Sequence, residues 1–244
     1  MILSYNKIFK RDKLAGSYIT DENMSYKIVV SRYNEDINWL LNNDNNCIIY
    51  NKGDLLNVKN EISLPNVGRE SHTYLHYIIT NYDNLPDVVC FTQGKISDIG
   101  LIDTGYNTEY VSHLIMLVNE AKTCGISKYS SLFYEKDKSI HCCSDWNIRN
   151  IPVKFLKYKD DINITFKDWF EKYIRIKYPD PIRWMPNAIF AVRKDKILKN
   201  DKEYYKNLIT TIDYDSNPIE GHFFERSWFY IFDPFQIYPN KVQV

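Results

Sequence analysis

Two short apolar runs separated by a helix-like stretch constrain the fold of this chain most strongly. Residues 26–31 (YKIVVS) and 47–50 (CIIY) have the length and composition of buried strands. Between them, the pattern around Trp39 predicts a short helix capped by Asn34 or Asp36. A strand, a helix and a second strand within about 25 residues form a βαβ unit, so we expect the two strands to be parallel.

The same alternation of elements continues along the chain. Residues 87–92 are apolar almost throughout, which predicts a central strand, whereas residues 126–165 have no clear periodicity. With 244 residues, the chain is long enough to bury one large core. The pattern therefore predicts an α/β fold with a mostly parallel central sheet flanked by helices. The other predicted elements are strands at 62–64 and 188–192 and helices at 69–81, 109–123, 166–176, 196–209 and 222–232.

Composition excludes several classes of protein. Lys plus Arg and Asp plus Glu both number 31, so a nucleic-acid binder with a general basic surface is not expected. The five cysteines match no zinc or disulfide framework, which favours reduced thiols. Residues 1–21 lack the apolar segment of a signal peptide, and no run of about 18 apolar residues predicts a membrane span. We therefore expect a cytoplasmic protein, in the host cytoplasm if the source is viral.

The stretch 64–76 (LPNVGRESHTYLH) concentrates polar side chains at a predicted helix start. Arg69, His72 and His76 fall at positions i, i+3 and i+7, on one side of that helix. A helix amino terminus attracts anions, and an arginine there opposes the helix dipole. We therefore expect Arg69 to serve an anionic ligand rather than the helix.

Polar residues and glycines follow the predicted strands. In open α/β sheets, ligands bind outside the carboxyl ends of the strands. The strand ends at 31–36, 51–53 and 92–94, with the helix start at 68–70, are therefore expected to converge on one site.

Four motifs in this order carry a resemblance to a known family. They are residues 30–36 (VSRYNED), 50–53 (YNKG), 66–75 (NVGRESHTYL) and 84–94 (NLPDVVCFTQG), and the late segments 186–192 and 225–228 fit as well. Together they resemble an uncharacterised domain family of fungi, bacteria and large DNA viruses. That family is in turn similar to nucleotide-sugar glycosyltransferases of the GT-A fold.

The resemblance covers residues 26–232 and implies a GT-A-like, Rossmann-type domain over 25–244 after an extension at 1–24. Residues 25–105 would bind the nucleotide-sugar donor and residues 106–244 a glycan or other hydroxyl acceptor. The donor and acceptor contacts that we expect from the resemblance and the strand ends are Ser31, Tyr33, Asn34, Glu35, Asn51, Lys52, Gly53, Asn66, Gly68, Arg69, Glu70, Thr92, Gln93, Trp184 and Arg226.

One departure from the GT-A pattern concerns the metal. These enzymes place an Asp-x-Asp pair after the fourth strand to bind Mn or Mg, whereas this chain has residues 91–94 (FTQG) there. Either other residues hold the metal, with His222 as a late ligand, or Arg69, Lys52 and Arg32 neutralise the diphosphate alone. Both alternatives stay open, because a leaving diphosphate needs positive charge from some source.

The acceptor hydroxyl of an inverting transferase needs a carboxylate base. Glu225, Asp98 and Asp103 are the candidates, with Glu220 as a fourth. Trp184 and Trp228 can each offer an aromatic face to a sugar or belong to the core. The trio His222, Glu225 and Arg226 can form part of a site or a buried ion pair.

Two rival functions follow from the same residues. The missing Asp-x-Asp pair is compatible with a non-catalytic nucleotide- or glycan-binding protein that has a degenerate transferase fold. His72 and His76, at i and i+4, can instead bind a metal with a carboxylate and make the chain a metal-dependent hydrolase.

Overall fold

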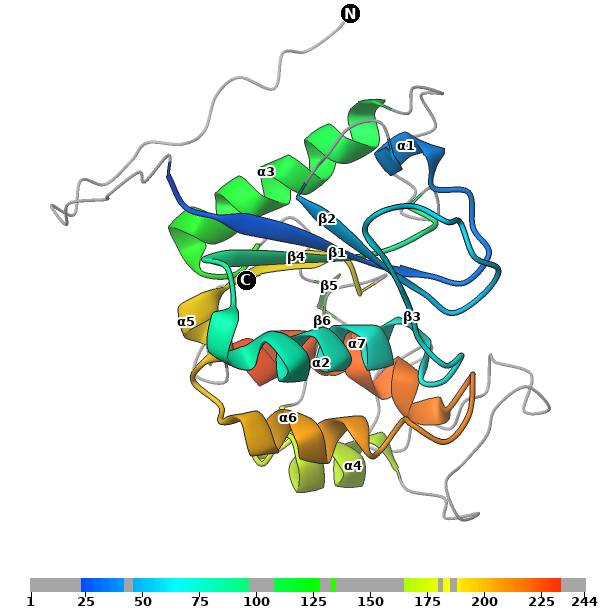
Figure 1. Ribbon diagram of the computed structural model, residues 1–244. Helices are drawn as coiled ribbons and strands as arrows, with labels where there is room; N and C mark the ends of the chain where they lie inside the picture. The colour runs from blue at the N-terminus through cyan, green and yellow to red at the C-terminus, as the bar shows by residue number, and fades with distance from the viewer. Residues whose placement is uncertain are drawn as a thin grey trace, which may run out of the picture.

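The fold is organised around a five-stranded sheet with the order β3-β2-β1-β4-β7 (Figure 1). The computed structural model describes residues 23–41, 46–96, 108–127, 133–134, 165–179, 182–184 and 188–233. β1, β2, β3 and β4 are parallel, and β7 joins β4 in the antiparallel direction at one edge. The strands are β1 (Tyr26–Arg32), β2 (Cys47–Asn51), β3 (Glu61–Ser63), β4 (Val88–Gln93) and β7 (Phe190–Arg193), and the separate pair is β5 (Phe133–Tyr134) and β6 (Arg183–Trp184).

Helices cover both faces of the sheet (Figure 1). α1 and α3 lie on one face, and α2 and α7 lie on the other, with α6 packed against α2 and α4 against α7. The helices are α1 (Asn38–Leu41), α2 (Arg69–Asn81), the 3₁₀ turn Tyr82–Asn84, α3 (Thr108–Cys124), α4 (Phe166–Tyr173), α5 (Lys194–Ile197), α6 (Lys202–Ile209) and α7 (Ile219–Phe232).

Each face of the sheet supports its own hydrophobic core. Side chains alternate along a strand, so Ile28 and Val30 of β1 point toward α1 and α3, whereas Val29 points toward α2 and α7. β4 alternates in the same way, with Phe91 in the aromatic core against Tyr74 of α2. Burial on both faces explains why these strands are apolar runs.

The predicted fold class is confirmed: the chain has an α/β fold with a five-stranded, mostly parallel sheet flanked by helices. The predicted parallel β1–β2 pair and the helix at 69–81 are also confirmed. The strand predicted as central, β4, has neighbours on both sides, but β1 occupies the middle of the sheet.

Three predicted helices differ in their bounds from the structure by more than one residue. The helix predicted at 196–209 is two helices, because α5 ends at Ile197 and the Asp201 carboxylate caps α6 by accepting from the Tyr204 amide at 2.7 Å. α4 ends three residues earlier than predicted, at Tyr173. α7 starts three residues earlier, at Ile219, directly after Pro218.

The two predicted halves share one sheet, because β7 from the second half completes it beside β4 from the first. Most of the predicted extension, residues 1–22, lies outside the described residues. In the described part of the chain, no helix is long and apolar enough to cross a membrane.

Candidate functional site

The carboxyl ends of the parallel strands lie side by side, as expected. In the strand register, Arg32 pairs with Asn51 of β2, and Ser31 pairs with Gln93 of β4. The Ser31 and Thr73 hydroxyls are 2.9 Å apart, which joins the end of β1 to α2. These strand ends and the start of α2 therefore form one edge of the molecule.

The order of the sheet reverses between β1 and β4, which is the position where open α/β sheets bind ligands. There the Tyr33 ring is half exposed, at 50%. The Glu35 carboxylate accepts from the Tyr33 amide at 2.6 Å and lies against Gly94, where a Cβ atom would be 3.0 Å from Oε2. The Trp39 indole N–H donates to the Gly94 carbonyl at 3.1 Å. This position therefore presents a fixed carboxylate beside an exposed aromatic ring.

The buried side chains of Arg32 and Asn51 hold the loops at this edge. The Arg32 guanidinium donates to the carbonyls of Glu35 and Asp54 at 2.9 and 2.8 Å and to Asn51 Oδ1 at 2.8 Å. The Asn51 amide donates in turn to the Asp54 carbonyl at 2.7 Å, and Asn34 Oδ1 accepts from the Asp54 amide at 2.8 Å. Arg32, which was predicted to contact a diphosphate, therefore holds the backbone of the loops after β1 and β2 in place.

α2 starts with two consecutive residues in the left-handed region. Gly68 has φ 61°, and its amide donates to the Asp215 carbonyl at 2.7 Å. A Cβ at this position would lie 2.6 Å from the Ile212 carbonyl, so the close approach of the 212–215 backbone requires glycine. Arg69 has φ 51° although it has a side chain, a conformation that costs about 1–2 kcal/mol.

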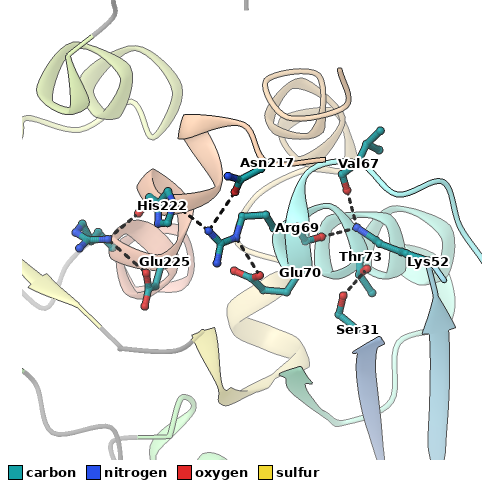
Figure 2. Close-up of polar contacts among 10 residues, drawn as sticks. Ser31, Lys52, Val67, Arg69, Glu70, Thr73, Asn217, His222 and Glu225 are labelled. Carbon is teal, nitrogen blue, oxygen red and sulfur yellow. Dashed lines mark hydrogen bonds and ion pairs between the residues drawn. The ribbon is translucent and has the colours of Figure 1, made fainter. Parts of the chain in front are cut away.

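Arg69 extends from α2 to the start of α7 (Figure 2). Its Nη1 donates to Nε2 of His222 at 2.9 Å and to Oδ1 of Asn217 at 3.3 Å, and its Nε is 3.6 Å from the Glu70 carboxylate. Gly221 leaves the space for it, because a Cβ there would be 2.9 Å from Arg69 Cδ. The side chain is still 35% exposed, so part of the guanidinium faces solvent.

His222 is the acceptor in this contact, since a guanidinium only donates. Its Nε2 is therefore unprotonated. Burial, with smaller contributions from Arg69 and Arg226, lowers the pKa of His222 to about 3. The buried Arg226 donates to the His222 carbonyl at 3.1 Å and to the Glu225 carboxylate at 3.4 Å. A metal on His222 Nε2 would face the Arg69 charge, so this geometry does not fit the predicted metal ligand.

Lys52 follows β2, and its side chain points toward the start of α2 (Figure 2). Its side chain is buried, and its ammonium donates to the Val67 carbonyl at 2.6 Å and to the Arg69 carbonyl. Burial lowers the pKa of Lys52 to about 8, and the Glu70 carboxylate opposes that shift.

The two histidines of α2 stack on each other, with ring centroids 6.2 Å apart. Burial is the largest cause that lowers both pKa values, that of His72 to about 4, and the Lys52 charge adds to it. Across the described ranges, no group of three or more His, Cys, Asp or Glu residues is placed to hold a metal ion. The described residues therefore give His72 and His76 no third ligand.

The remaining predicted residues have varied positions. Asn66 is exposed in the loop before α2, Gly53 packs against the Tyr33 carbonyl, and Thr92 is buried. Asp98 and Asp103 lie outside the described residues, and only the backbone of Trp184 is described, in β6.

The structure decides between the two alternatives that the sequence left open for Trp228. Trp228 is fully buried and packs on Phe190 and Phe232, so it belongs to the core and offers no face to a sugar.

Sequence reasoning missed three polar groups at this edge. Asn217 binds Arg69, Thr73 contacts Ser31, and the Tyr214 hydroxyl donates to the buried Glu220 carboxylate at 2.6 Å. The Asn-Pro pair before α7 was a signal for a helix start there, but nothing in the sequence indicated contact with Arg69.

Searches of curated proteins and of solved structures found no match to this chain. A protein-family model, described as protein of unknown function (DUF3431), matches residues 28–244. The match includes every described strand from β2 onward, all described helices and the candidate site. The chain therefore belongs to the DUF3431 family.

Proposed function

We propose that this protein is a glycosyltransferase that takes a sugar from a nucleotide-sugar donor and passes it to a hydroxyl acceptor such as a glycan. The proposal extends the GT-A resemblance of the sequence motifs. It includes that the protein works in the cytoplasm. The observation that carries it is Arg69: its backbone has a positive φ, and its partly exposed guanidinium lies where the amino termini of α2 and α7 meet beside the parallel strand ends.

The charge balance at this edge favours an anion such as a diphosphate. The Arg32 guanidinium donates to uncharged oxygens, so its positive charge adds to that of Arg69, and the Glu70 carboxylate 3.6 Å from Arg69 Nε offsets part of the total. α2 and α7 both start here, and helix amino termini add partial positive charge. An anion bound at Arg69 would therefore be stabilised both by a direct hydrogen bond and by the surrounding field.

The nucleoside would lie at the reversal point between β1 and β4. The exposed Tyr33 ring can stack on a base, and the Glu35 carboxylate can accept hydrogen bonds from ribose hydroxyls. Gly94 supports this arrangement, since a larger residue would displace Glu35.

Glu225 is the described carboxylate that best fits the acceptor side. It is partly exposed, at 21%, on the first turns of α7, whereas Glu220 is buried and accepts from Tyr214. Glu225 would take the proton of the acceptor hydroxyl as it attacks the anomeric carbon and the nucleoside diphosphate leaves. Asp98 and Asp103 stay as predicted alternatives for this role.

A calorimetric and thermal-shift screen with UDP, GDP and uridine, with Mn²⁺ or with EDTA, tests the donor site. We expect a nucleoside diphosphate to bind, and at 100 times its Kd to stabilise the fold by about 2.7 kcal/mol, while uridine binds far more weakly. Absence of binding by every nucleoside diphosphate would reject the transferase. The Mn²⁺ and EDTA arms decide whether a metal takes part.

The rival binding function is separated by chemistry rather than by affinity. If the protein binds the donor but neither hydrolyses nor transfers its sugar over many hours with glycan acceptors, the non-catalytic alternative is favoured. Release of the nucleoside diphosphate by the unaltered protein, together with loss of that release in the Glu225→Gln variant, would support the transferase.

A further inference from the structure

Lys52 holds the backbone from which Arg69 extends. Its ammonium lies between two carbonyl oxygens, those of Val67 and Arg69, which are 15 and 17 residues away along the chain (Figure 2). We propose that Lys52 is a positioning residue: by binding these two carbonyls, it fixes the left-handed Gly68–Arg69 turn and thereby aims the Arg69 guanidinium. The inference rests on the proposed function for its link to donor binding.

The two carbonyls are the ones that define this turn. The Val67 carbonyl belongs to the peptide plane before Gly68, and the Arg69 carbonyl belongs to the plane after Arg69. Between these planes, the rotatable backbone angles are the φ and ψ of Gly68 and Arg69. A single group that holds both oxygens therefore constrains the two residues that have positive φ, 61° and 51°.

A lysine suits this position because its ammonium is a compact donor with three N–H groups. Two of them serve the carbonyls of Val67 and Arg69. The backbone of Lys52 is anchored as well. Its amide donates to the Arg32 carbonyl at 2.8 Å, which connects residue 52 to the end of β1. The turn is thus fixed to the sheet itself.

Burial separates the role of Lys52 from that of Arg69. The Lys52 side chain is buried, whereas Arg69 is 35% exposed. Lys52 therefore acts on a ligand through the Arg69 backbone, and Arg69 makes the contact.

A double-mutant cycle on UDP affinity tests this role. Lys52→Met, Arg69→Ala and the double variant would be compared with the unaltered protein by calorimetry. We expect Lys52→Met to weaken UDP about tenfold through lost preorganisation, Arg69→Ala to weaken it more, and the double variant to match Arg69→Ala. Losses that multiply, or an unchanged affinity in Lys52→Met, would overturn the proposal.

Hydrogen exchange gives a readout that needs no ligand. In Lys52→Met, the amides of residues 68–72 should exchange at least about tenfold faster than in the unaltered protein, with the β1 and β4 amides unchanged. If the unaltered protein binds no nucleotide, the proposed function fails, and this exchange pattern still decides the role of Lys52. Unchanged exchange at 68–72 would overturn it.

Two further variants complete the design. Lys196→Met is the matched control, because Lys196 is a partly buried lysine that pairs with Asp233 at 3.0 Å, away from the site. The UDP affinity of this variant and the exchange of its 68–72 amides should stay unchanged. If Lys52→Met does not fold, Lys52→Gln replaces it, since an amide keeps donors and loses the charge. The shorter glutamine side chain cannot hold both carbonyls as the ammonium does, so the 68–72 amides of Lys52→Gln should exchange faster than in the unaltered protein. Exchange as slow as in the unaltered protein would overturn the proposal.

Discussion

Two arginines in the described part of the chain have positive φ, and they differ in their positions in the fold. Arg175, with φ 63°, follows Ile174, the C-cap of α4, and its guanidinium lies 5.4 Å from the centroid of the Tyr204 ring. Helices very commonly end with one left-handed residue. Arg69, with φ 51°, stands instead in the first turn of α2, where helical residues normally have negative φ.

The comparison teaches that the same conformation needs different explanations. At Arg175, the left-handed residue ends a helix, and a glycine could replace it. At Arg69, three segments hold the turn: Lys52 binds its carbonyls, the 212–215 backbone packs on Gly68, and His222 receives the guanidinium. Strain that is maintained by so many contacts is typical of binding sites.

The largest expected effect separates the two arginines by ligand affinity. Arg69→Gly should weaken UDP binding roughly 30- to 150-fold, since a hydrogen bond to a charged group contributes about 2–3 kcal/mol. Arg175→Gly should leave UDP affinity unchanged. Calorimetry on both variants, with circular dichroism to verify folding, measures the contrast. Equal affinities in the two variants would remove Arg69 from the site.

The next effect tests whether the direction of Arg69 matters and not only its charge. In Gly221→Ala, the new Cβ would lie 2.9 Å from Arg69 Cδ, so the guanidinium must move away from His222. We expect about tenfold weaker UDP binding with the fold retained, because alanine favours the helix. In an Arg69→Ala background, Gly221→Ala should have no further effect; an additional loss there would show that α7 itself had moved.

The sequence was sufficient for the fold because the fold depends on local patterns. The apolar runs of β1, β2 and β4 and the polar residues after them predicted the parallel sheet and the edge where the strand ends meet. The break between α5 and α6 was not predicted, although residues 199–203 (KNDKE) are all polar and Asp201 is of a type that caps helices. The Asn200 amide at this break also donates to the Ile231 carbonyl at 2.7 Å, a tertiary contact that the sequence does not reveal.

For the site, the sequence indicated residue types but not their orientation. Arg69 was predicted as an anion contact from its unfavourable position in the helix dipole, and this stays a prediction; the structure places its partly exposed guanidinium beside His222 and Asn217. Arg32 and Lys52 were predicted as anion contacts, but both point into backbone carbonyls. No periodicity reveals which way a long cationic side chain turns, and no local signal reveals a left-handed arginine.

A smaller effect concerns the histidines on the Arg69 side. The pKa values of His72 and His222 are lowered to about 4 and about 3, so the unfolded chain binds more protons than the folded one below pH 6.5. Stability should therefore fall as the pH drops from 6.5, by at most about 1.4 kcal/mol per pH unit for each histidine. Urea unfolding at pH 7 and pH 5 measures this loss. The His222→Asn variant should lose less between the two pH values; an equal loss would mean that His222 is not the group that titrates.

The smallest effect measures the strain itself at both arginines. Glycine tolerates positive φ and alanine does not, so the stability difference between the glycine and alanine variants reports the backbone term alone. We expect Arg69→Gly to be about 1 kcal/mol more stable than Arg69→Ala, and Arg175→Gly to exceed Arg175→Ala by a similar amount. Chemical denaturation of the four variants provides the values. If alanine equals glycine at residue 69 but not at 175, the first turn of α2 relaxes once the guanidinium is removed. The strain would then be imposed by the contacts of the Arg69 side chain with α7 and not by Lys52 beneath it.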